Sequence, residues 1–469
     1  MKRKISLLLF LLISTASFAA DGVVFNDVSR LNPVTVNKIV KVHGLKDISD
    51  AIVEAKDKGL KVSISGKRHS QGGQQSCANC IVLDMMEYNK VISLDNDKKI
   101  IRVQPGMTWE QIQNYLQPFG YAVKVMQASN IFTVGGALGP NIHGNDPNYG
   151  AIIETVESFH LMRPDLTVVN VSRQENPELF KLVIGGYGLF GVIIDVTLSL
   201  TDDVIYEMQS KVMDYKEYPE FVKTYVLNHP SVGLHSAKLS NAPSSLLREI
   251  VTTTYIKSTK YDKALFKLQE EKDVERNKMF FGLSRISDWG KDLRWDLQKR
   301  LIAKVGQIEY VSRNNAMRPI VKFLDYYSSK DTDILQEYFV PMEKFVLFVD
   351  GLREIIKTDH VNLLSITVRY MPQDKESFLP YAKTNSFALV LYINQKLTAS
   401  EMQKAQTWTR KIVDLSLDCG GTYYLPYQLY PSRQQLLRAY PEFDEFIKKK
   451  EMYDSEDLFV NQFYKHYRL

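Results

Sequence analysis

The sequence predicts a mixed α+β fold in which strands and helices alternate through the first half of the chain. Three observations support this prediction: short β-branched runs, periodic apolar segments between them, and glycine-rich turns that follow the strands. The chain has 469 residues, enough for two or three domains and a large buried core.

The predicted elements follow one another closely after residue 32. A strand over 39–42 leads to a helix over 48–58, and a strand over 61–64 then enters a glycine-rich loop. Pro105 and Gly106 form a turn before a predicted helix. The further elements are strands at 81–83, 91–94 and 100–103 and a helix at 109–116.

The charge pattern argues against two classes of partner. The formal net charge of +5 comes from 59 basic and 54 acidic residues, which are spread along the chain rather than gathered in one basic run. Neither a nucleic acid nor a membrane surface is therefore indicated as a partner.

The first twenty residues have the pattern of a secretory signal peptide. Basic residues at 2–4 precede an apolar run at 5–13, and small residues precede Asp21. The apolar run is shorter than the roughly 20 residues that span a bilayer, and no second candidate follows. We expect residues 1–20 to be removed and the mature protein to be periplasmic or secreted; an uncleaved membrane anchor is the alternative.

Three cysteines are too few for a disulfide scaffold. Cys77 and Cys80 form a C-x-x-C pair, which in an exported chain is compatible with a disulfide, a metal half-site, a redox pair or free thiols. No second pair completes a zinc site, so no metal is expected. Cys419 is predicted to be a small buried residue.

Three clusters of glycine and small polar residues stand out. The segment 65–74 places His69 between glycines and serines, where backbone N–H groups and hydroxyls can approach a cofactor closely. The segment 127–144 has too many glycines for a stable helix interior, so we expect tertiary contacts or a ligand to hold it.

The third cluster, 185–191, contains the G-x-G-x-x-G spacing at Gly186, Gly188 and Gly191. A β-branched strand over 192–198 follows it, whereas a Rossmann dinucleotide site requires a helix there. The spacing therefore does not indicate a Rossmann fold.

Together these segments resemble the FAD-binding domain of the vanillyl-alcohol-oxidase superfamily, the PCMH type. In that superfamily three separated loops wrap an extended FAD. The matching stretches are Ser65 to Gly73, Thr133 to Ala137 with Asn141 to Gly144, a hairpin from Glu154 to Phe159, and Gly186 to Ile193.

The resemblance continues into the alditol and aldonolactone oxidase branch through 336–341, 363–370 and the C-terminal 453–464. It implies a two-part PCMH-type FAD-binding domain and a substrate (cap) domain built on an antiparallel sheet flanked by helices. The implied boundaries are a FAD-binding domain at 32–201, a cap domain at 202–440 and a C-terminal segment at 441–469 that returns to the FAD domain.

The resemblance also implies which residues bind FAD. His69 occupies the position at which many members attach the flavin covalently through an imidazole nitrogen, and no cysteine in 130–143 offers a second link. Lys67 and Arg68 replace the glycines common before this histidine, so we expect the local backbone to avoid positive φ. His143 is assigned either a structural or a catalytic role. The expected FAD-binding residues are Ser65, Gly66, Lys67, Arg68, His69, Ser70, Gln71, Ser129, Thr133, Gly135, Gly136, Asn141, His143, Gly144, Gly191, Ile193 and Asn461.

Three residues are the candidates for catalysis. In the predicted strand 365–370, alternation places Thr367 and Arg369 on one face with Ser365. A buried guanidinium there needs a polar partner, either the flavin or substrate, or an ordinary salt bridge. By resemblance Arg369 matches an active-site arginine, while Thr367 replaces a glutamate. Tyr427, in an aromatic run that core packing also explains, is a candidate base.

The function expected from this resemblance is FAD-dependent oxidation of a hydroxyl-bearing carbon in a sugar, alditol or aldonolactone-type substrate. Hydride would pass to flavin N5, and Arg369 would stabilise developing negative charge. O2 is the preferred electron acceptor, and an acceptor other than O2 is the alternative. The alternatives are oxidation of an amine or aromatic alcohol, as in cytokinin dehydrogenases, and a non-catalytic exported flavin-binding protein.

Overall fold

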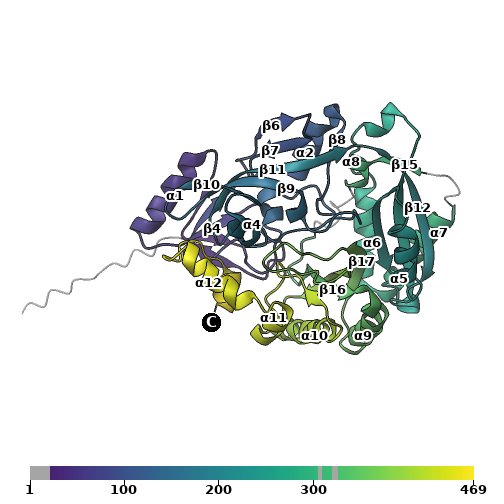
Figure 1. Cartoon of the computed structure of the whole chain (residues 1–469). Helices are drawn as coiled ribbons and strands as arrows, with labels where there is room; N and C mark the ends of the chain where they lie inside the picture. The colour runs from purple at the N-terminus through teal and green to yellow at the C-terminus, as the bar shows by residue number, and fades with distance from the viewer. Residues whose placement is uncertain (1–21, 305–308, 319–325, 469) are drawn as a thin grey trace, which may run out of the picture.

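The computed structural model describes residues 22–304, 309–318 and 326–468, and Figure 1 shows how their helices and strands are arranged. The predicted signal peptide at 1–20 lies outside these residues. Within the described ranges, no helix combines the length and the apolar character that crossing a bilayer requires. Helices and largely antiparallel sheets are mixed throughout, which confirms the α+β class at this level.

A small parallel sheet with the order β3-β5-β4 supports the first glycine loop. Helix α1 packs on it through Ile48, Ala51, Ile52 and Ala55, whose three- and four-residue spacing gives the helix one apolar face. The predicted strands are confirmed within one residue, and the helix begins three residues earlier than expected. The elements are β3 (Lys38–Lys41), α1 (Leu45–Asp57), β4 (Val62–Ser65) and β5 (Ile81–Asp84), preceded by the pair β1 (Val23–Phe25) and β2 (Val34–Val36).

A second sheet has the order β10-β9-β11-β7-β6, with β8 paired to β11. The predicted helix at 109–116 is confirmed as α2 (Trp109–Leu116), because Thr108 and Gln111 form a reciprocal capping box at its start. The strands are β6 (Val91–Asp95), β7 (Ile100–Val103), β8 (Tyr121–Val123), β9 (Val156–Met162), β10 (Val168–Ser172) and β11 (Val192–Asp202).

One local expectation in this region is confirmed and one is corrected. The segment 127–144 contains one short helical turn, α3 (Val134–Leu138), and tertiary contacts hold it as expected: the Gly135 N–H donates to the Pro105 carbonyl at 2.8 Å, and the Thr133 hydroxyl accepts from the Gly136 N–H at 3.2 Å. The hairpin expected from Glu154 begins later: Ile152–Thr155 is a 3-10 turn, and β9 then pairs with β10.

The largest sheet is antiparallel, with the order β15-β12-β14-β13-β17-β18-β16-β19. Its central strands are long and have few exposed residues, as expected for a sheet covered on both faces. The strands are β12 (Ile205–Asp214), β13 (Val232–Leu239), β14 (Glu249–Lys257), β15 (Glu309–Ser312), β16 (Asp331–Pro341), β17 (Leu363–Met371), β18 (Ser386–Lys396) and β19 (Thr422–Tyr423).

Helices cover both faces of this sheet. On one face α9 packs against β18, where the Phe345 and Phe387 rings lie 5.0 Å apart, and α10 lies beside α9 (Figure 1). On the other face α6 and α7 border a large cavity. The helices beyond α3 are α4 (Pro177–Val183), α5 (Tyr218–Phe221), α6 (Val274–Ile286), α7 (Asp288–Lys304), α8 (Arg313–Ala316), α9 (Phe345–Thr358), α10 (Ala399–Asp418), α11 (Arg433–Ala439), α12 (Phe443–Tyr453) and α13 (Gln462–Tyr467).

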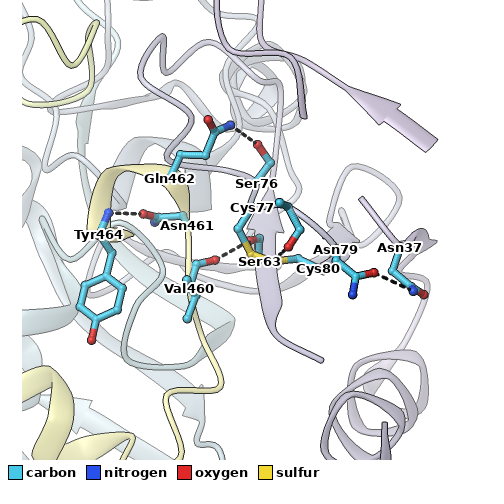
Figure 2. Close-up of a disulfide and its surroundings, with 11 residues drawn as sticks. Asn37, Ser63, Ser76, Cys77, Asn79, Cys80, Val460, Asn461, Gln462 and Tyr464 are labelled. Atoms are coloured by element: carbon cyan, nitrogen blue, oxygen red, sulfur yellow. Dashed lines mark hydrogen bonds between the residues drawn. A yellow bond between two sulfur atoms is a disulfide. The ribbon is translucent and has the colours of Figure 1, made fainter. Parts of the chain in front are cut away.

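The C-terminal segment returns to the parallel sheet. Val62 N–H donates to the Leu458 carbonyl at 2.8 Å, and Val460 N–H donates to the Val62 carbonyl at 2.9 Å. Figure 2 shows that the Ser63 hydroxyl also donates to the Val460 carbonyl. Residues 458–460, just before α13, thus form a short parallel bridge beside β4.

Cys77 and Cys80 form a disulfide directly after the first glycine loop, so the disulfide alternative is confirmed (Figure 2). Both side chains are fully buried, and the Ser63 hydroxyl lies 3.4 Å from Cys77 Sγ. Cys419 is free and buried, as predicted.

Candidate active site

A cavity of about 1060 Å³ lies between the glycine loops and the large sheet. This volume is at the upper end of the ~300–1000 Å³ common for small-molecule sites. Most of the residues predicted to bind FAD line it, together with all three candidates for catalysis. These lining residues are Ser65, Gly66, Lys67, Arg68, His69, Ser70, Ser129, Thr133, Gly135, Gly136, His143, Gly191, Ile193, Thr367, Arg369 and Tyr427.

Four of the predicted FAD-binding residues do not line the cavity. Gln71 binds the Leu335 N–H through its side chain at 2.9 Å, and Asn461 donates to the Tyr187 carbonyl at 2.9 Å. Asn141 accepts from the Ile153 N–H at 3.1 Å, and Gly144 packs against the backbone of a neighbouring segment. The contacts of all four hold the loops together rather than border the cavity.

His69 lies at the cavity wall with its ring edge-on to Phe132, the two centroids being 4.7 Å apart. Burial, assisted by the charge of Lys67, lowers the pKa of His69 to about 4. The imidazole is therefore neutral at physiological pH. A neutral imidazole has a free nitrogen lone pair, which is what a nucleophile or hydrogen-bond acceptor needs.

The backbone before His69 differs from the sequence-based expectation. Arg68 has φ of +61°, so the prediction that this stretch avoids positive φ is wrong. Such a conformation costs a non-glycine residue roughly 1–2 kcal/mol. Side-chain contacts offset it, because the Arg68 guanidinium lies 4.2 Å from the centroid of the Phe25 ring and 3.4 Å from an Asp84 oxygen.

The first and second glycine loops contact each other at Gly66. A Cβ at this position would lie 2.3 Å from Thr133 Oγ1, the atom that caps α3. The two loops can therefore approach only because residue 66 has no side chain. Ser129 Oγ and Gln75 Oε1, from two cavity-lining residues, are buried and have no hydrogen-bond partner among the described residues.

Replacing Gly66 by alanine is expected to lower FAD content and destabilise the protein by about 1–3 kcal/mol, because Thr133 must leave its capping position or the loops must separate. Gly44→Ala is the matched control, since a Cβ there meets nothing within 4 Å. The ratio of flavin to protein absorbance and the unfolding midpoint measure the two effects. Equal flavin content and equal unfolding midpoints in the two variants would contradict the close contact between Gly66 and Thr133.

The third glycine cluster reaches the cavity through Gly191, whose φ is +146° and whose Cα lies against the Met162 carbonyl. Strand β11 follows this glycine directly, so no helix N-terminus points at the cavity here. The absence of the Rossmann arrangement at this cluster agrees with the sequence prediction.

The sheet face opposite the loops is polar. Ser365, Thr367 and Arg369 of β17 line the cavity, whereas Ile366 and Val368 are fully buried on the other face, as alternation predicts. Arg369 Nε is buried without a hydrogen-bond partner among the described residues, and its guanidinium forms no ion pair with them. The salt-bridge alternative is therefore not supported.

Glu337 is a cavity residue that the sequence prediction missed. It pairs with Val390 on β18, which also pairs with Thr367 on β17, so the three side chains form one row across the sheet face. Its Oε1 lies 2.5 Å from His143 Nε2, and both side chains are almost completely buried. A carboxylate followed directly by the apolar run 338–341 is the signal that could have identified it.

Tyr427 donates a hydrogen bond to Glu337 Oε2 at 3.3 Å. Burial, together with the charge of Glu337, raises the pKa of Tyr427 well above its usual value, so the phenol keeps its proton. It therefore acts as a donor in this network, which disfavours Tyr427 as the base. In the surrounding aromatic run, Tyr424 also reaches the cavity, while Tyr423 and Tyr430 belong to the core.

No group of three or more potential metal-ligating side chains comes together in the described ranges. The ionisable groups around the cavity include the paired Glu337 and His143 side chains, the Arg369 guanidinium and the neutral imidazole of His69.

Comparison with known proteins agrees with this arrangement. Residues 36–172 match a family described as FAD binding domain, and residues 257–467 match a family described as D-arabinono-1,4-lactone oxidase. By these two matches the chain is similar to the PCMH-type FAD-binding superfamily, near its aldonolactone oxidase branch.

Individual relatives of this flavoprotein are distant. L-gulonolactone oxidase from Mus musculus is 28% identical over 152 residues, covering 32% of the chain and 34% of the relative. Decaprenylphosphoryl-beta-D-ribose oxidase from Mycolicibacterium smegmatis is 28% identical over 170 residues, covering 36% and 37%. Mitochondrial L-galactono-1,4-lactone dehydrogenase from Arabidopsis thaliana is 29% identical over 171 residues, covering 36% and 28%. The chain thus spans about a third of the length of these relatives.

The cavity of this flavoprotein fits FAD. Its three glycine-bearing loops allow close backbone approach, and unpaired polar atoms of Gln75, Ser129 and Arg369 belong to side chains around it. An unpaired buried polar atom costs about 1–3 kcal/mol, which a ligand rich in carbonyl, amide and hydroxyl groups can relieve.

Proposed function

We propose that this protein uses FAD to oxidise a hydroxyl-bearing carbon in a sugar, alditol or aldonolactone-type substrate. One observation carries the proposal: a single cavity joins the His69 loop to the sheet face that bears Arg369 and Glu337. The matches to FAD-binding and lactone-oxidase families support the same chemistry. When bound, FAD supplies the two-electron acceptor for the hydride.

The residues of the chain have separate roles in this proposal. The buried pair of Glu337 and His143 accepts the hydroxyl proton of the substrate, because both side chains line the cavity and their 2.5 Å contact lets them share a proton. Tyr427 fixes the second oxygen of that carboxylate. Arg369 holds developing negative charge with a guanidinium that has no competing ion pair among the described residues.

His69 is the proposed site of covalent flavin attachment. The pKa of about 4 leaves its ring nitrogen unprotonated, and the ring borders the cavity. A single linkage is expected, because no cysteine occurs in 130–143.

The proposed division of the chain follows the sheets. A FAD-binding domain at 32–201 contains the two smaller sheets that carry the glycine loops, and a cap domain at 202–440 contains the large antiparallel sheet. The segment at 441–469 adds a short parallel bridge beside β4.

The substrate class is tested by adding sugars, alditols, aldonolactones, amines and aromatic alcohols to the flavin-loaded protein without oxygen. Bleaching of the flavin absorbance by a polyhydroxylated substrate is the expected result, and admitted air should restore the colour if O2 is the acceptor. Bleaching only by an amine or an aromatic alcohol would show that the substrate belongs to that class and not to the sugars, alditols or aldonolactones. A flavin that none of these compounds reduces would contradict the enzyme function.

Glu337→Gln is expected to slow anaerobic flavin reduction by about 100-fold, because an amide cannot accept a proton as a carboxylate does. The nearly isosteric amide should preserve the fold, so the unfolding midpoint should change little. Stopped-flow absorbance and thermal unfolding measure the two effects. An unchanged rate would show that the pair of Glu337 and His143 does not accept the hydroxyl proton of the substrate.

Export is proposed from residues 1–20 and is supported by the buried disulfide between Cys77 and Cys80, since disulfides persist in oxidising compartments. Expression in a bacterial host followed by mass measurement should give a periplasmic protein that begins at Ala20 or Asp21. A full-length protein retained in the cytoplasm would contradict export.

A further inference from the structure

The cavity contains many more cations than anions. Among the described residues that line it, six side chains are cationic and only Glu337 is a carboxylate. Glu337 is already paired with His143. The cationic residues are Lys67, Arg68, Lys238, Arg276, Arg294 and Arg369.

Two of these cations are already neutralised by nearby carboxylates. Arg68 lies 3.4 Å from an Asp84 oxygen, and Arg276 lies 2.9 Å from an Asp273 oxygen. Lys238 and Arg294 have no such partner: neither forms an ion pair with a described residue. Two uncompensated charges at one end of a cavity are unfavourable unless an anion joins them.

Lys238 lies on a different strand from the one that Gln71 and His143 contact. It pairs with Thr367 across β13 and β17, which places both side chains on the cavity face. Gln71 binds Leu335 and His143 binds Glu337 on β16, whereas Asn145, just after the second loop, accepts from the His235 N–H of β13 at 2.8 Å. Strands β17 and β18 separate β13 from β16, so at ~4.8 Å per strand Lys238 is displaced by ~14 Å from the strand that Gln71 and His143 meet.

Arg294 reaches the same end of the cavity from helix α7. Its Nη1 donates to the Leu364 carbonyl at 2.9 Å, and its guanidinium lies 4.0 Å from the centroid of the Phe281 ring. These contacts fix the guanidinium without neutralising it. Burial, assisted by Arg285, lowers the pKa of Arg294 to about 10.

The exposed side chain of Lys238 lines this cavity. Surrounding protein, together with the charge of Arg294, lowers the pKa of Lys238 to about 8. The charge of Arg294 thus disfavours the protonated form of Lys238.

We propose that Lys238 and Arg294 form a subsite for an anionic group of the substrate, a carboxylate or a phosphate, at the end of the cavity away from the flavin loops. The subsite rests on the proposed function, because it assigns the polar sheet face to substrate. The reacting carbon would lie near Arg369 and Glu337, and the anion would extend along the row from Thr367 to Lys238. The expected substrates are therefore sugar acids or sugar phosphates rather than neutral polyols.

The test compares three probes with the same six-carbon chain: D-glucitol, D-gluconate and D-glucitol 6-phosphate. Binding to the flavin-loaded protein is measured by calorimetry without oxygen. We expect at least one anionic probe to bind about 10-fold or more tightly than D-glucitol. Preference for gluconate alone would identify a carboxylate, and preference for the phosphate alone would identify a phosphate.

The variants assign the preference to the subsite. Lys238→Met should reduce it to about 3-fold or less, and Lys238→Arg should retain most of it, because the charge is kept. Lys238→Gln is a second variant if the methionine form does not fold. Lys211→Met is the matched control, since it removes an exposed lysine of the same sheet next to cavity-facing Ser210 and therefore on the opposite face.

Equal binding of the three probes, binding of none, or a preference that persists in both Lys238→Met and Lys238→Gln would overturn the subsite. Failure of the proposed function gives a different result. In that case the anionic probes still bind preferentially through Lys238, but no hydroxylated compound reduces the flavin.

Discussion

Arg369→Ala is expected to slow anaerobic flavin reduction by about 100-fold or more while leaving the flavin content close to that of the unmodified protein. Arg369 lines the cavity from the sheet face opposite the glycine loops, and its Nε has no partner among the described residues. Its removal therefore takes away a charge that faces the reacting centre without breaking an ion pair in the described part of the fold. Stopped-flow absorbance at the flavin band measures the rate.

Two companion variants separate catalysis from structure. Arg369→Lys should recover part of the rate, because a point charge remains without the planar donor fork. Ser365→Ala, four residues before Arg369 on the same face, should change the rate by much less. If Arg369→Ala lost flavin and rate in equal proportion, the arginine would be structural.

His69→Ala is expected to abolish covalent flavin attachment completely while leaving a folded protein that binds FAD reversibly. The alanine removes the neutral imidazole at the cavity wall, and the contacts of the other two glycine loops remain. Flavin fluorescence in a denaturing gel and the colour of acid-precipitated protein measure attachment. Flavin fluorescence retained by the variant would show that the flavin is linked to a residue other than His69.

The control for this experiment is His160→Ala, which removes an imidazole that pairs with Asp195 outside the cavity. It should keep the covalent flavin. A pH series gives a second check: because the pKa of His69 is about 4, the imidazole stays neutral as pH falls from about 8 to about 5.5, and the attachment rate should not fall over this range. An attachment rate that fell as the pH dropped through about 6.5, the ordinary pKa of histidine, would contradict the low pKa of His69.

Local features of the fold could be predicted from the sequence. Strand 61–64 and helix 109–116 are marked by β-branched runs and by the Thr108 and Gln111 capping pair, which act over a few residues. The alternation around Arg369 likewise predicted which of its neighbours share the cavity face. These signals need no knowledge of distant contacts.

The missing parts of the site depend on contacts between distant segments. Glu337 reaches His143 across 194 positions, and Lys238 reaches the cavity only because β13 pairs with β17. The backbone at Arg68 was wrongly predicted to avoid positive φ for the same reason, since Phe25 and Asp84 stabilise this conformation from other strands. Strand order is not encoded in the local pattern, so these neighbours could not be identified in advance.

The short bridge that residues 458–460 form beside Val62 has a consequence for biosynthesis. The Ser63 hydroxyl binds the Val460 carbonyl 397 positions further along, and the first cofactor-facing turn begins two residues after Ser63. A nascent chain that ends before residue 460 lacks the contacts that complete the sheet edge beside this turn. We therefore expect the prosthetic group to bind stably only after synthesis has passed residue 460.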